Sequence, residues 1–171
     1  MIGLNVAIIS LVGRYIGADD MGRLREVIKA GFLMGLGYSA ILAVVFFVFR
    51  APLVDLFVDA GAEFASIMAL GSFMMIGLAT YVVADATILI SGGVLRGAGD
   101  TKWLMWVSIG LHWLMLVVQY FVIRVWSLGP KVSWVVFVAM ILMTAGAYIA
   151  RLMSSKWRTR EAFARVMSEQ W

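Results

Sequence analysis

Four long apolar stretches constrain what this chain can fold into. They cover about residues 27–49, 63–95, 103–126 and 132–153. Each is long enough to cross a hydrocarbon core of ~30 Å, which takes about 20 helical residues. The stretches are continuous and lack the alternation of a membrane β-barrel. The sequence therefore predicts an all-α polytopic membrane bundle with roughly four full transmembrane helices.

The composition agrees with a lipid environment. The chain is 63% hydrophobic and 14% charged, with a mean hydropathy of +0.97. A soluble domain carries about a quarter charged residues. Most of the surface is therefore expected to face lipid, so the bilayer itself is the first predicted partner.

The first apolar run, about residues 2–17, is shorter than a span. Its apolar part is too short to cross a bilayer, and no basic segment precedes it as in a signal peptide. We therefore predict that this run is the end of a truncated first helix and that the chain is the tail of something longer. Residues 1–153 form the predicted membrane lobe fragment. Residues 154–171 form a predicted cytoplasmic tail, for which an amphipathic helix and a frayed polar end both stay open.

Lysine and arginine alternate between the two sides of the predicted bundle. Eleven of the 14 fall on one side: Arg14, Arg23, Arg25, Lys29, Arg96, Lys102, Arg151, Lys156, Arg158, Arg160 and Arg165. The positive-inside rule places that side in the cytoplasm. We expect a multi-pass protein of the plasma membrane, the inner membrane in bacteria, with a cytoplasmic C-terminus.

Several kinds of chemistry lack the residues that they need. The chain has no cysteine and one histidine, which leaves no thiol nucleophile, no Cys-based metal site and no histidine cluster. No pairing of nucleophile and base is visible either. We therefore expect no enzyme activity, no catalytic residue, no bound metal and no nucleic-acid partner.

One acid, Asp85, interrupts the longest apolar run. A carboxylate inside a bilayer costs several kcal/mol and often marks an ion or proton path. Asp85 could load and release a proton, or bind Na⁺ together with oxygens of Tyr81 and Thr87. Tyr81 lies four residues earlier, on the same helical face. The alternatives are an Asp85 at the membrane interface and a Tyr81 that only fills space.

Two polar residues share the next apolar run. His112 and Gln119 are seven residues apart and so lie on one helical face. They are candidates for polar groups of a cavity or for hydrogen bonds to another helix. Gly31 and Gly35 form a G-x-x-x-G pattern, which favours close contact between helices.

Two segments carry a resemblance to a known family. They are LVGRYIGADD near the start and LRGAGDTK, whose arginine follows Asp85 by eleven residues. Together they resemble the C-terminal half of the multidrug and toxic compound extrusion (MATE) family, over Met1 to about Trp157. The resemblance implies the end of helix eight and helices nine to twelve of a twelve-helix, two-lobed fold.

The resemblance also implies a function. Asp85 falls where the family carries a cation-binding acid on its tenth helix. Na⁺ or H⁺ would then drive export of a cationic or amphipathic small molecule by alternating access, with no cofactor other than the coupling ion. The N-terminal lobe is absent from this sequence, so transport is expected to need that lobe or a partner half.

The glycine-rich segment would form the tight cytoplasmic turn between helices ten and eleven. Arg96 would hold the inner face, and Gly97 and Gly99 would permit the reversal. Asp100 with Thr101 offers a cap for the next helix.

Two other functions remain open at this point. A relative of the lipid-linked-sugar flippases would share the fold, but its cavity should be rich in arginine, and the long spans here hold none in their interior. A non-transporting membrane remnant or scaffold would tolerate the loss of Asp85, whereas a transporter would not.

Overall fold

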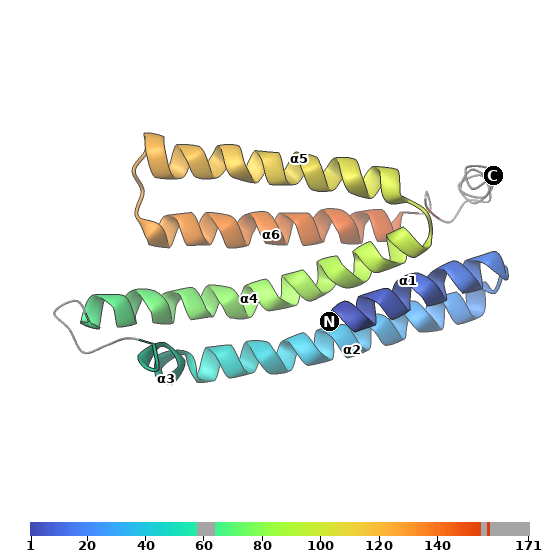
Figure 1. The fold of residues 1–171 in the computed structure, drawn as a ribbon, viewed down its shortest axis with the longest axis horizontal. Helices are drawn as coiled ribbons and strands as arrows, with labels where there is room; N and C mark the ends of the chain where they lie inside the picture. Colours follow the sequence, from blue (N-terminus) through green and yellow to red (C-terminus); the bar gives the residue numbers. More distant parts are fainter. Residues whose placement is uncertain (58–63, 155–156, 158–171) are drawn as a thin grey trace.

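The computed structural model describes residues 1–57, 64–154 and 157, which form helices joined by short turns (Figure 1). The elements are α1 (Ile2–Gly17), α2 (Met21–Val48), α3 (Arg50–Asp55), α4 (Phe64–Gly97), α5 (Thr101–Tyr120), the π-helix η1 (Phe121–Val125) and α6 (Pro130–Met153). These described residues contain no strand, which confirms the predicted all-α bundle. Apart from Ser154 and Trp157, the predicted tail of residues 154–171 lies outside them.

Four of these helices are long and apolar enough to cross a bilayer. They are α2, α4, α5 continued by η1, and α6, whereas α1 is a shorter apolar helix. The chain is thus a multi-pass membrane protein. α2 begins at Met21, earlier than its apolar run, because Asp20 caps it: an Asp20 carboxylate oxygen accepts from the Arg23 amide at 3.0 Å.

The helix α4 is the centre of the bundle. It has 34 residues and a length of about 51 Å, well beyond the ~30 Å hydrocarbon core. It packs against α1, α2, α3, α5 and α6. In Figure 1 it runs between α2 on one side and α6 on the other. The apolar run over residues 63–95 is too long for one straight span, and the structure shows it as a single unbroken helix.

Two local features interrupt the regular pattern of the spans. Pro52 lies in the first turn of α3, the short helix between the spans α2 and α4. Proline is tolerated there because the first amides of a helix have no partner within it. The second feature is η1, which ends the α5 span with a wider turn: the Trp126 amide donates to the Phe121 carbonyl at 2.9 Å.

The turn from α4 to α5 closes with backbone hydrogen bonds. The Gly99 amide donates to the Arg96 carbonyl at 3.0 Å, and the Asp100 amide donates to the Leu95 carbonyl at 2.9 Å. This pair of bonds is a Schellman motif. Gly99 has a φ of 80°, a left-handed conformation that glycine adopts without steric cost.

The turn from α1 to α2 repeats this design. The Asp19 amide donates to the Ile16 carbonyl at 3.1 Å, and the Asp20 amide donates to the Tyr15 carbonyl at 2.9 Å. Asp19 takes the left-handed position, with a φ of 54°. The sequences GADD (17–20) and GAGD (97–100) therefore form the same kind of turn.

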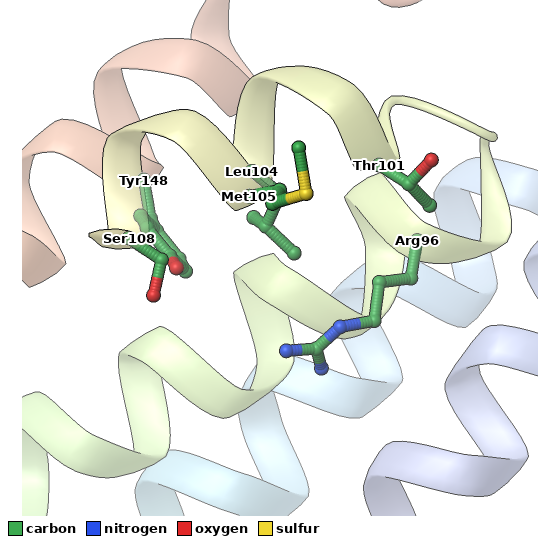
Figure 2. Close-up of a pocket in the computed structure, with 6 residues that line it drawn as sticks. All are labelled: Arg96, Thr101, Leu104, Met105, Ser108 and Tyr148. Atoms are coloured by element: carbon green, nitrogen blue, oxygen red, sulfur yellow. The ribbon is translucent and has the colours of Figure 1, made fainter. Parts of the chain in front are cut away.

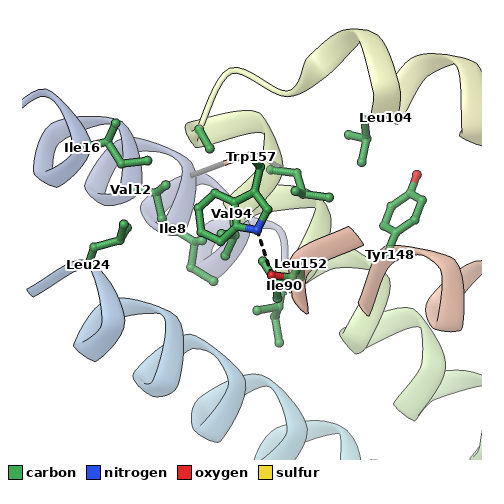
Figure 3. Close-up of a cluster of buried hydrophobic side chains, with 12 residues drawn as sticks. Ile8, Val12, Ile16, Leu24, Ile90, Val94, Leu104, Tyr148, Leu152 and Trp157 are labelled. Atoms are coloured by element: carbon green, nitrogen blue, oxygen red, sulfur yellow. Dashed lines mark hydrogen bonds between the residues drawn. The ribbon is translucent and has the colours of Figure 1, made fainter. Parts of the chain in front are cut away.

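The packed core gathers at the end of the bundle that holds these two turns (Figure 3). Its buried side chains are Ile8, Val12, Ile16, Leu24, Ile90, Val94, Leu95, Ala98, Leu104, Tyr148, Leu152 and Trp157. Trp157 is fully buried, and its indole Nε1 donates to the Leu152 carbonyl at 2.8 Å. Trp157, which follows α6 in the chain, thereby contributes to this core.

Glycines bring the helices of this end into close contact. The side chain of Ile90 lies directly over Gly35, and that of Ile8 lies over Gly31. This confirms the close approach that the G-x-x-x-G pattern predicts. At Gly97 a Cβ would lie 2.7 Å from the Ile9 carbonyl oxygen of α1. Gly97 is thus needed for the contact between α4 and α1.

Candidate functional site

Asp85 lies inside the apolar helix α4 and opens onto a cavity. The side chain is half-buried and makes no hydrogen bond or ion pair with any described residue. The cavity has a volume of about 540 Å³, and its walls come from α1, α2 and α4. Its lining residues are Met1, Ile2, Gly3, Tyr38, Ser39, Leu42, Val82, Asp85 and Ala86. A carboxyl group is therefore available to a ligand in otherwise largely apolar surroundings.

Ser39 of α2 is the polar neighbour that the sequence analysis did not single out. It is fully buried, and its hydroxyl donates to the Leu36 carbonyl at 3.1 Å. The hydroxyl oxygen keeps lone pairs that can accept a hydrogen bond or bind a cation. One signal could have found it: Ser39 continues the small-residue spacing of Gly31 and Gly35 on the face that packs against α4.

Tyr81 and Thr87 do not line this cavity. The Tyr81 ring stacks on Phe137 of α6, with 5.9 Å between the ring centroids. The Thr87 hydroxyl donates to the Val83 carbonyl of its own helix at 2.9 Å. Neither makes a hydrogen bond to Asp85. The structure brings Ser39 and Tyr38, rather than these two, to the cavity that Asp85 faces.

His112 and Gln119 lie on α5, away from Asp85. The His112 ring nitrogen Nδ1 is 2.7 Å from the Ser108 carbonyl oxygen, one turn earlier on the same helix. Gln119 instead joins α5 to α6. Its amide Nε2 donates to the Ser133 carbonyl at 2.9 Å, and the Ser133 hydroxyl donates to Gln119 Oε1 at 2.8 Å. Gln119 is thus engaged in helix packing.

The residues of the glycine-rich turn serve different contacts. Asp100 occupies the N-cap position of α5, but its side chain makes no capping hydrogen bond, which corrects the expected cap with Thr101. Its Oδ2 accepts instead from the Arg151 Nε of α6 at 2.7 Å. Arg96 and Thr101 line a separate pocket of about 230 Å³ beside α5 (Figure 2).

A buried amide anchors α1 to α4 and was also missed by the sequence analysis. Asn5 is buried, and its Nδ2 donates to the Leu89 carbonyl at 2.7 Å. One asparagine in an apolar helix gave only a weak signal for such a bond. In the part of the chain that the structure describes, no three acidic or histidine side chains gather as a metal site would need.

Comparisons with known proteins agree on one family. A model of the MatE family matches residues 1–121. A probable multidrug resistance protein NorM of Thermotoga maritima is 28% identical over 165 residues, which cover 95% of this chain and 34% of that protein. The multidrug resistance protein MdtK of Photorhabdus laumondii is 23% identical over 156 residues, or 88% of this chain and 33% of that protein.

The chain therefore spans about a third of the length of the curated relatives it matches. No solved structure matches the chain.

Proposed function

Because the chain belongs to the MatE family, we propose that it is part of an antiporter that exports drugs in exchange for Na⁺ or H⁺. Its relatives carry the name multidrug resistance protein, which supports an export role. The proposed substrate is a cationic or amphipathic small molecule. No cofactor is needed beyond the coupling ion.

The observation that carries this proposal is the position of Asp85. Its carboxyl group faces a cavity of about 540 Å³ from within an unbroken apolar helix, with no described basic residue paired to it. A charged carboxylate is costly inside an apolar membrane helix, and binding of H⁺ or Na⁺ neutralises its charge. Loading and unloading of the ion would therefore change the electrostatic energy of the cavity.

Two further cavity residues fit a role in ion binding. Ser39 and Tyr38, which carry hydroxyl oxygens, line the same cavity from α2. Hard cations such as Na⁺ prefer oxygen ligands, as Ca²⁺ and Mg²⁺ do. Tyr81 and Thr87, proposed from the sequence, would have to turn from their present contacts to join them.

The proposed orientation places the packed end of the bundle in the cytoplasm. Both Schellman turns and the end of α6 lie at this end. It corresponds to the side of the predicted bundle to which eleven of the 14 lysine and arginine residues belong. The positive-inside rule then puts the C-terminus inside, in the plasma membrane.

We further propose that transport needs a complementary membrane lobe, supplied by a longer chain or by a partner. An alternating-access path forms between two lobes. This chain aligns with only about a third of the length of its relatives.

Efflux of a fluorescent cationic dye tests the proposal. Cells would express this chain alone, or together with the N-terminal half of a MatE relative. Efflux that needs both halves and is lost in Asp85→Asn supports a coupled transporter. Asp55→Asn at the end of α3 is the control, because it removes an acid from an exposed site. Undiminished efflux in Asp85→Asn, or no efflux from chains shown to be inserted and folded, contradicts it.

A further inference from the structure

A second, smaller pocket lies where α4 turns into α5 (Figure 2). It has a volume of about 230 Å³, and its lining residues are Arg96, Thr101, Leu104, Met105, Ser108 and Tyr148. We propose that this pocket binds a phosphate group, either of a phospholipid headgroup or of free phosphate. The proposal does not depend on whether the chain transports drugs.

Arg96 supplies a positive charge that no described acid neutralises. Asp100, the acid on the adjoining turn, is paired with Arg151 instead. The guanidinium of Arg96 folds back along α4, with one nitrogen 3.7 Å from where a Cβ of Gly92 would lie. Figure 2 shows it extending across the pocket toward the side that holds Ser108 and Tyr148.

Tyr148 supplies a hydroxyl donor from α6. The residue is 3% exposed and lines the pocket, and its hydroxyl makes no hydrogen bond with any described residue. The hydroxyl oxygen itself is not fully buried, so the pocket leaves it open to a ligand. The ring is held in place by Trp103, at 6.1 Å between centroids, and by Gly92, whose absent side chain leaves room for it.

The combination of groups selects an anion. The half-buried Ser108 lines the same pocket and adds a second hydroxyl. No carboxylate lines the pocket. A guanidinium beside two hydroxyl donors matches the several acceptor oxygens of a phosphate, and charge-assisted hydrogen bonds of this kind are the strong ones.

The depth of the pocket suits a lipid phosphate. α4 is about 20 Å longer than the hydrocarbon core, and Arg96 lies one residue before its end. Trp103 and the exposed Trp106 follow within the first two turns of α5, and tryptophan favours the membrane interface. The pocket thus lies at the level where headgroup phosphates gather and where aqueous phosphate also reaches.

Native mass spectrometry of the purified full chain tests the proposal. Phosphatidylglycerol is the probe, diacylglycerol is its phosphate-free counterpart, and inorganic phosphate is the competitor. We expect one tightly retained phosphatidylglycerol and no retained diacylglycerol. Displacement of the lipid by millimolar phosphate would identify a general phosphate site. Resistance to it would identify a site for the lipid headgroup.

Variants locate the binding. We expect Arg96→Gln to weaken phosphatidylglycerol binding by tenfold or more, because it removes a charged hydrogen bond. We expect Tyr148→Phe to weaken it by about threefold, because it removes a neutral one. Arg124→Gln removes the same charge from the exposed η1 and should change binding less than twofold. Tyr148→Phe keeps the ring packing, so it tests the site even if Arg96→Gln does not fold.

Three results would overturn the proposal. One is equal loss of binding in Arg96→Gln and Arg124→Gln, which would indicate general attraction to charge. Another is unchanged binding in Tyr148→Phe. The third is equal retention of diacylglycerol and phosphatidylglycerol.

Discussion

Asp100 and Arg151 join the turn after α4 to the end of α6, with Oδ2 and Nε 2.7 Å apart. The two side chains are 16% and 17% exposed, respectively, so water screens the pair only partly. Arg151 also lies over the ring of Trp103, with 5.1 Å from its guanidinium carbon to the ring centroid. The aspartate of the glycine-rich segment therefore fixes the relative position of three helices.

The first prediction concerns this pair. Asp100→Asn should destabilise the protein by about 1–3 kcal/mol, because it leaves Arg151 partly buried without its counter-charge. Thermal unfolding in detergent measures the effect. In a double-mutant cycle, Asp100→Asn with Arg151→Gln should cost less than the sum of the two single changes. Additive losses would mean that the pair contributes no interaction energy.

The second prediction compares two glycines. Gly97→Ala should destabilise the protein by about 1–3 kcal/mol, because its Cβ would meet the Ile9 carbonyl and Val12 of α1. Gly146→Ala in α6 is the matched control, since nothing lies within 4 Å of its Cβ position. It should be neutral or stabilise the helix by up to about 1 kcal/mol. Equal melting temperatures for the two variants would contradict the close contact between α1 and α4.

The third prediction separates the candidate ligands of the coupling ion. Ser39→Ala should reduce Na⁺- or H⁺-driven dye efflux by the reconstituted transporter several-fold, because Ser39 lines the cavity that Asp85 faces. Thr87→Val should have a smaller effect, since Thr87 does not line that cavity. The concentration of Na⁺ or H⁺ that gives half-maximal efflux is the readout. A larger shift in Thr87→Val than in Ser39→Ala would support the ligand set proposed from the sequence.

The fourth prediction concerns the bond between α5 and α6. Gln119→Leu should destabilise the protein by about 1 kcal/mol, because it removes two reciprocal hydrogen bonds with Ser133. His112→Leu is the control, because among the described residues the exposed His112 ring bonds to the Ser108 carbonyl of its own helix rather than to α6. Thermal unfolding of both variants measures the difference. A cost in His112→Leu as large as that in Gln119→Leu would show that hydrogen bonding to α6 is not the cause.

The sequence predicts the helices well because their signal is local. Twenty or more apolar residues in a row need no partner to be recognised as a span, and the spacing of Gly31 and Gly35 already marks a contact face. The sequence also identifies Asp85 as a candidate site residue, because a single acid is conspicuous in an apolar run.

The sequence predicts the surroundings of Asp85 less well because they depend on how the helices are rotated and placed. Tyr81 shares a helical face with Asp85 by spacing, yet Phe137 of α6 holds its ring. Ser39 lies 46 residues from Asp85 in the chain, and only the packing of α2 against α4 brings it to the same cavity. Asp100 looks like a cap from its neighbours alone, and its partner Arg151 is 51 residues away.

The central place of α4 limits how this bundle can deform. One continuous helix touches five others, so a shift of α4 changes its contacts with each of them. A displacement that begins at Asp85 would therefore act mainly on α1, α2 and α6, which share the most extensive contacts with α4. The neighbour α5, which touches α4 least, would keep more freedom to move.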